Sequence, residues 1–224
     1  MKTKLQIRVK KSLPAILAFM VLSLSAIAAS PEEGFRMLKQ RNGINLYYRW
    51  IQMPEGNKVR EMKAVLEIDG GTTEVIDLLK DEQRGTNWIA SAEQFRNLTD
   101  ASGNNWISYI QFSTPWPLAD QDCVLEYSIE QDPAGQSVVR FTRIPEYIPA
   151  VDGVTRMKDI SGSIVIRTLS EGKSILELYF LSKKASALPK WLVEPIITGN
   201  MFNLLEGLRN ELTAVQTCQT LVKP

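Results

Sequence analysis

Alternating apolar and polar positions run through most of the chain and predict a protein rich in β-strands. Two stretches, 44–51 and 59–68, carry apolar residues at every second position and are separated by a turn at 53–57. This pattern is typical of an antiparallel hairpin with one buried face. Further stretches of the same character follow along the chain: 95–99, 106–112, 124–129, 138–143, 160–169 and 175–181.

Helical periodicity is confined to a few stretches. Residues 31–41 are predicted to form a short amphipathic helix with Phe35 and Leu38 on one side, and an Asn-Gly turn follows it. Thr72 or Thr73 is expected to cap the next helix. Residues 81–92 give a second short helical stretch.

The longest helical pattern spans 189–215, where apolar residues recur every three or four positions. A kink or restart is expected at Pro195, because proline removes an interior hydrogen bond. This order of elements predicts a curved antiparallel sheet with one long helix against its concave face. Periodicity alone leaves open whether side chains fill the space between them or a cavity remains.

The stretch from Ser113 to Val124 interrupts the alternation between two predicted strands. Two prolines flank Trp116, and neither can donate a hydrogen bond to a sheet ladder. We therefore expect a shaped loop, with an apolar tip that is unusual for a loop. Two interpretations stay open for Trp116: an anchor packed on the core, or a ligand contact in a lid over a pocket. Trp88 is expected in the core.

The first residues have the composition of a secretory signal peptide. Five basic and no acidic residues fall within 1–11, the run 13–27 is almost entirely apolar, and Ala26-Ile27-Ala28 is a small-x-small cleavage site. We therefore expect residues 1–28 to be cleaved and the protein to be secreted, in a bacterium to the periplasm. An uncleaved N-terminal anchor is the alternative, although the apolar run is short for a membrane span.

Composition narrows the chemistry of the mature chain. Five of the 26 basic residues and none of the 25 acidic residues lie in the leader, so the mature chain is mildly acidic and is not expected to bind nucleic acid. The chain contains no histidine, which excludes Ser-His-Asp and Cys-His catalysis and histidine metal ligands. Neither a metal nor a cofactor is expected. Cys123 and Cys218 allow one disulfide, but their spacing does not show that they are close.

Residues 114–124, with the sequence TPWPLADQDCV, resemble the Pro-Trp-Pro and Asp-Arg-Asp stretch of the START family of lipid-binding and lipid-transfer domains. This family belongs to the helix-grip (Bet v 1-like) superfamily. The resemblance covers residues 33–214, and the chain resembles a bacterial secreted member of the family. Gln121 stands where the family usually has arginine and Cys123 where it usually has an apolar residue, so an ion pair made by that arginine is in question. Supporting matches occur in order at Glu61-Met62-Lys63-Ala64, Asn87-Trp88-Ile89, Ile160-Ser161-Gly162 and Leu188-Pro189-Lys190-Trp191-Leu192-Val193.

The resemblance implies the helix-grip fold, an α+β architecture in which a curved antiparallel β-sheet wraps around a long C-terminal α-helix. It divides the chain into a signal peptide (1–28), a START-like lipid-binding domain (33–214) and a flexible tail (215–224). It also implies an apolar cavity between sheet and helix, where burial supplies the affinity for a ligand. The residues expected at its mouth and along its lining are Trp116, Pro117, Leu118, Trp191, Leu192, Ile196, Ile197, Met201 and Leu204.

The implied function is a monomeric binding or transfer protein for a lipid or other hydrophobic small molecule, with transient membrane contact and no catalytic residues. Two alternatives stay open. One is a cyclase- or hydrolase-like enzyme of the same superfamily, which would need carboxylates such as Glu61, Glu126 or Glu177 inside the cavity. The other is a protein-docking module that uses the loop around Trp116.

Overall fold

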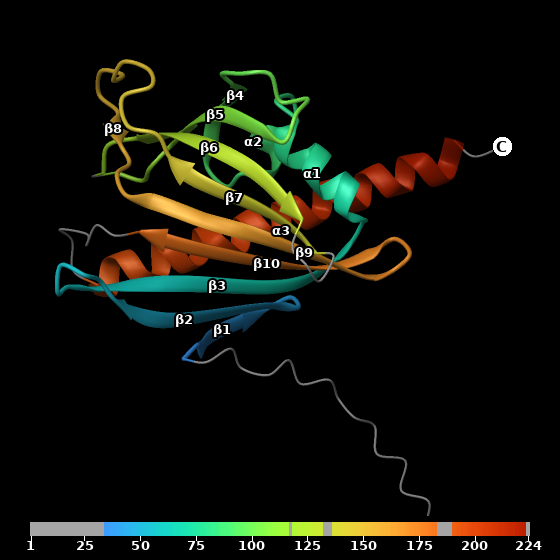
Figure 1. Cartoon of the computed structure of the whole chain (residues 1–224), viewed down its shortest axis with the longest axis horizontal. Coiled ribbons are helices and arrows are strands. Elements are labelled where there is room, and N and C mark those ends of the chain that lie inside the picture. Colours follow the sequence, from blue (N-terminus) through green and yellow to red (C-terminus); the bar gives the residue numbers. More distant parts are fainter. Residues whose placement is uncertain (1–33, 117, 132–135, 183–189, 223–224) are drawn as a thin grey trace, which may run out of the picture. The chain divides into compact units, whose positions relative to one another are not determined.

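A computed structural model of the chain describes residues 34–116, 118–131, 136–182 and 190–222, with the side chains of 190–193 and 216–222 left out. The strands are β1 (Arg36–Arg41), β2 (Ile44–Gln52), β3 (Lys58–Asp69), β4 (Ala92–Asn97), β5 (Asn105–Phe112), β6 (Gln121–Gln131), β7 (Ser137–Arg143), β8 (Thr155–Arg156), β9 (Ile160–Ser170) and β10 (Lys173–Ser182). The helices are α1 (Thr72–Lys80), α2 (Gly85–Trp88) and α3 (Lys190–Val222) (Figure 1).

The strands form one sheet in the order β1-β2-β3-β10-β9-β7-β6-β5-β4, with β8 paired to β6 off this path. The neighbours along the path run antiparallel, whereas β6 and β8 run parallel. α3 runs along one face of this sheet (Figure 1). An open antiparallel sheet with a long C-terminal helix confirms the predicted α+β helix-grip fold, and the strands expected from alternation are all present.

The register gives the sheet two different faces. The face that packs against α3, here called the inner face, carries rows of buried apolar side chains. One such row, read across five strands, is Leu46, Ala64, Leu178, Ile164 and Val139. The opposite or outer face carries the intervening and mostly polar positions of the same strands. The buried core therefore lies between the sheet and the helices.

The apolar stripe of α3 supplies the other half of this core. Its most deeply buried members are Phe202, Leu205, Leu208 and Leu212, each 1 or 2% exposed. Ion pairs tie the helix to the sheet: Arg41 binds Glu206 at 2.9 Å, and Arg60 binds Glu194 at 2.8 Å. No helix in the described part of the chain is both long and apolar enough to cross a membrane.

The N-terminal stretch that we predict as a helix is a strand. Arg36–Arg41 pairs antiparallel with β2. Asn42 and Gly43 connect the two strands with φ values of 49° and 75°, the left-handed values that a tight two-residue hairpin turn requires. The prediction is wrong because Met, Leu, Lys and Gln favour helices intrinsically, whereas pairing with the edge of β2 decides the conformation.

The two short helices differ from prediction in extent. The N-cap of α1 is Gly71 and no side chain caps the helix, so the predicted threonine cap is wrong. Of the stretch 81–92, only Gly85–Trp88 is helical. The carboxylate of Asp81 accepts hydrogen bonds from the backbone N–H groups of Gln83 and Arg84, which builds a turn in place of another helical turn. Trp88 is buried in the core, as expected.

The long C-terminal helix is confirmed. Pro195 lies inside α3, which continues as a single helix, so there is no restart, and the kink that is the other expectation stays a prediction. The helix continues to Val222, so the backbone of most of the segment 215–224 is helical.

Two glycines of α3 generate opposite predictions. An added Cβ on Gly207 would lie 2.6 Å from the carbonyl oxygen of Trp88 and 2.9 Å from its Cα, whereas Gly199 has no neighbour within 4 Å outside its own helix backbone. Gly207→Ala should therefore lower the free energy of unfolding by about 1–3 kcal/mol, because backbone must move. Gly199→Ala is the control and should raise it by about 0.5–1 kcal/mol. Denaturant unfolding measures both, and equal effects would contradict this packing of α2 on α3.

Candidate functional site

The burial of apolar side chains changes along α3. Ile196 and Ile197, near its N-terminal end, are half-buried, whereas Met201 is 8% and Phe202 is 1% exposed. The later part of the helix is thus packed as core. Apolar side chains in the first described part of the helix stay partly accessible.

Half-buried apolar side chains of the sheet gather at the same end. Phe112 at the end of β5 and Phe180 near the end of β10 belong to the inner face but are half-buried, whereas Trp106 and Leu176 on the same strands are 1% exposed. We call this end the mouth region: the first part of α3, the ends of β5 and β10, and the loop 113–120. Half-buried apolar side chains of both the sheet and α3 therefore lie at this end of the domain.

The loop between β5 and β6 forms one side of the mouth region. It is shorter than expected, because β6 already begins at Gln121. Trp116 is 91% exposed, so the interpretation of this residue as an anchor packed on the core is wrong. Leu118 is half-buried, and its N–H donates to the carbonyl oxygen of Pro115 at 3.1 Å. The loop therefore presents an indole ring to solvent from a turn.

Two acidic residues fix the base of this loop. The carboxylate of Asp120 accepts a hydrogen bond from the N–H of Thr114 at 2.9 Å and closes the loop. Asp122 is 1% exposed and binds Arg156 through two hydrogen bonds of 2.7 and 2.9 Å. Hydrogen bonding to Asp122 raises the pKa of Arg156 above its ordinary value. A buried, two-point ion pair thus joins the start of β6 to β8.

The arginine in this pair comes from a segment that the sequence analysis left without a role. Arg156 lies 34 residues after Asp122 and supplies the charge that Gln121 lacks. Its guanidinium also donates to the carbonyl oxygens of Ile148 and Pro149 and so holds the segment 144–159 against β6. The alternation of apolar and polar residues could not predict this contact, because β8 is only two residues long.

Aromatic side chains cross the inner face from β5 to β7. Trp106 stacks on Tyr127 with ring centroids 4.7 Å apart, and Tyr127 lies 6.1 Å from Phe141. Cys123 is a free, buried thiol on the same face of β6, and burial raises its pKa to about 12. Burial also raises the pKa of Tyr127 far above its ordinary value. These groups stay neutral at neutral pH and suit apolar contacts. The side chain of Cys218 lies outside the described residues.

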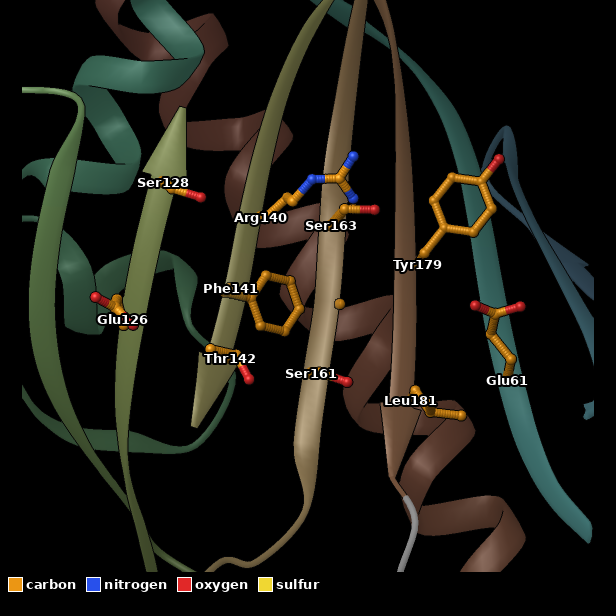
Figure 2. Close-up of a pocket in the computed structure, with 11 residues that line it drawn as sticks. Glu61, Glu126, Ser128, Arg140, Phe141, Thr142, Ser161, Ser163, Tyr179 and Leu181 are labelled. Carbon is orange, nitrogen blue, oxygen red and sulfur yellow. The ribbon is translucent and has the colours of Figure 1, made fainter. Parts of the chain in front are cut away.

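A pocket of about 540 Å³ lies on the outer face, on the side of the strands away from α3 (Figure 2). Its lining is mostly polar and consists of Glu61, Glu126, Ser128, Arg140, Phe141, Thr142, Ser161, Gly162, Ser163, Tyr179 and Leu181. Two of its charged members are already paired, Glu61 with Arg49 at 2.6 Å and Arg140 with Glu130 at 3.0 Å. This open polar depression is not the apolar cavity that we expect between sheet and helix.

The carboxylates considered for an enzyme lie on the outer face. Glu61 and Glu126 line the outer pocket, and Glu177, 7% exposed, binds Lys63 at 3.0 Å and also Arg167. Because they face away from α3, they do not lie between the sheet and the helix. Within the described residues, no group of three or more His, Cys, Asp or Glu side chains is placed to hold a metal ion.

The structure places the predicted ligand residues in different surroundings. Trp116 is exposed, Leu118, Ile196 and Ile197 are half-buried members of the mouth region, and Met201 and Leu204 pack against the core. The backbones of Trp191 and Leu192 belong to α3, but their side chains and the whole of Pro117 lie outside the described residues. Phe112 and Phe180 were missed, although alternation along their strands assigns both to the buried face.

Known proteins share the sequence pattern and the fold of this chain. Residues 28–218 match the START domain family. The chain belongs to the START domain family. This START domain is similar to the STAR-related lipid transfer protein of Xanthomonas axonopodis, with 21% identity, a TM-score of 0.71 and coverage of 81% of this chain and 99% of the other. Human STARD10 shares 14% identity with a TM-score of 0.68, covering 86% of this chain and 78% of that protein. An uncharacterised protein of Pseudomonas aeruginosa is 22% identical over 178 residues, 80% of this chain and 86% of its own length.

The buried ion pair generates a stability prediction. Arg156→Gln should lower the free energy of unfolding by about 3–5 kcal/mol, because Asp122 then stays buried without its counter-charge. Adding Asp122→Asn should recover much of that loss, because the second variant removes the buried charge as well. Arg140→Gln, in an exposed pair with Glu130, is the control and should cost about 1 kcal/mol or less. A double-mutant cycle by denaturant unfolding measures the coupling, and simple additivity would contradict the pair.

Proposed function

We propose that this START domain is a carrier that binds a lipid or other hydrophobic molecule between the inner face of the sheet and α3. The observation that supports it is the mouth region, where apolar side chains of α3, β5 and β10 stay half-buried at one end of a well-packed core. A ligand that covers such surface gains roughly 25 cal/mol per Å² of apolar area removed from water. The name of the Xanthomonas relative describes lipid transfer, which agrees with this proposal.

The proposed carrier is secreted, and in a bacterium periplasmic. The leader 1–28 supports this location through its basic start, apolar run and small-x-small cleavage site. A periplasmic location would place the protein between two membranes, where a hydrophobic molecule needs a carrier to cross the aqueous space.

The proposed role is binding or transfer of the ligand without catalysis. The carboxylates that an enzyme would need, Glu61, Glu126 and Glu177, face away from α3, and burial keeps Cys123 a neutral thiol. None of these four groups therefore favours a cyclase- or hydrolase-like activity on a ligand held between the sheet and α3.

We further propose that Trp116 makes transient contact with the membrane. An indole ring that is 91% exposed on a loop beside the mouth region suits the headgroup level of a bilayer, where tryptophan is enriched. Contact there would place the mouth region against the lipid surface during loading. A protein-docking role for the same loop would instead give a stable partner and no ligand.

The first test is native mass spectrometry of the monomer purified from its own compartment. We expect a mass equal to residues 29–224 plus a hydrophobic molecule that organic extraction removes. The protein part of this mass reports cleavage of the leader, and the excess reports the ligand. An intact leader would contradict secretion by cleavage, and a bare mass together with no binding of fluorescent lipids would contradict the carrier.

Trp116→Ala should slow transfer of a fluorescent lipid between vesicles several-fold while leaving the free energy of unfolding within about 0.5 kcal/mol of wild type, because the side chain packs on nothing. Leu169→Ala is the matched control: Leu169 is 51% exposed but lies at the far end of β9. Stopped-flow transfer and denaturant unfolding measure the two quantities. Equal transfer rates for the two variants would contradict the membrane contact.

A further inference from the structure

Arg143 differs from the other half-buried arginines of the described chain. Each of the others binds an oxygen atom of another residue. Six bind a carboxylate, and the pairs are Arg41 with Glu206, Arg49 with Glu61, Arg60 with Glu194, Arg84 with Asp81, Arg156 with Asp122 and Arg167 with Glu177. Arg209 donates to the carbonyl oxygen of Asn42. Arg143 has no side-chain hydrogen bond or ion pair with any described residue, and its Nε is buried without an acceptor. An N–H group that is buried without an acceptor is costly, and an anion bound at this guanidinium would relieve that cost.

The register places Arg143 on the inner face. It is the last residue of β7 and lies opposite Leu125 of β6, a core residue that is 7% exposed. Phe141, two residues earlier, shares this face. On the other side Ile160, also buried, follows one register step beyond the pair of Thr142 and Ser161. The side chain therefore stands between apolar neighbours, at the end of β7 that leads into the segment 144–159.

The carboxylates at this end of the sheet are already engaged or exposed. Asp122 and Glu194 are each bound by another arginine, and Asp120 accepts a backbone hydrogen bond inside its loop. Asp159 is exposed just before β9. The connection to α3 and its first turn, residues 183–193, contain no acidic residue at all. None of the described carboxylates therefore makes an ion pair with Arg143.

We propose that Arg143 binds an anionic group of the ligand, which is then an amphiphile with a carboxylate or phosphate and an apolar chain. This inference rests on the proposed function. A guanidinium holds either group through two parallel N–H···O bonds, and such bonds are roughly twice as strong as neutral ones. The apolar chain would lie along the inner face toward Phe141 and the mouth region. Apolar surroundings strengthen the ion pair relative to water.

The test compares three ligands that share the same saturated hydrocarbon chain: a fatty acid, its methyl ester and the corresponding alkyl phosphate. Displacement of an uncharged fluorescent probe from the full mature protein measures each affinity. Wild type should bind the acid or the phosphate about ten- to a hundredfold more tightly than the ester. The better of the two anions identifies the source of the charge.

Variants locate the preference. Arg143→Gln should abolish it by weakening anion binding to the level of the ester while leaving the ester unchanged, and Arg143→Lys should keep part of it. Arg140→Gln is the matched control on the same strand, because Arg140 lies on the outer face away from α3 (Figure 2). It should bind all three ligands as wild type does.

Each outcome separates this inference from the carrier function. Equal affinity of wild type for acid and ester, or a preference that survives Arg143→Gln, would overturn the anion site while the carrier stands. Failure to bind any of the three ligands would overturn both. Arg143→Met guards against a folding artefact: its melting temperature without ligand should equal or exceed that of wild type, because an unpaired charge is removed. A fall of several degrees would show a structural role and contradict the proposal.

Discussion

The inner face of the sheet is apolar across the strands from β2 to β5, and α3 is the long element that buries it. The helix is held unequally along its length. Around Glu206 the helix is held by hydrogen bonds that Arg41 and Asn42 donate to this carboxylate, by the ion pair with Arg41, and by the burial of Phe202. Near its N-terminal end, an ion pair between Arg60 and Glu194 accompanies described side chains that are only half-buried. Burial free energy thus concentrates in the later part of the helix, and accessible apolar surface is left at the mouth region.

The charges around the mouth region follow one physical rule with one exception. A buried charge needs a partner with good geometry, and Asp122 satisfies this through the two-point contact with Arg156. That contact also sets the position of the segment 144–159, so the same pair stabilises the fold and shapes the wall beside the loop 113–120. Arg143 is the exception at this end of the sheet, a charge on an apolar face without a partner from the described chain.

The sequence predicted what depends on periodicity and missed what depends on tertiary pairing. Alternation located β2, β3 and the strands after residue 95, and the three- and four-residue steps located α3. Arg36–Arg41 was assigned to a helix because its residues favour one, although the Asn-Gly that follows is a strong hairpin signal. β8 carries no pattern in its two residues. The position of Arg143 was readable, because it alternates with Val139 and Phe141 on the buried face; what alternation does not tell is that no carboxylate meets it.

Apolar burial and a single fixed charge contribute differently to recognition. Covering the half-buried side chains of the mouth region would stabilise nearly any hydrophobic molecule of suitable size, because burial is non-directional. Selectivity needs a group whose interaction depends on the identity of the ligand, and an unpaired guanidinium is such a group: it favours an anion and disfavours a neutral analogue that leaves it unpaired. The cost that Arg143 imposes on the empty domain is then the origin of discrimination, since the ligand that relieves the cost is the one that is retained.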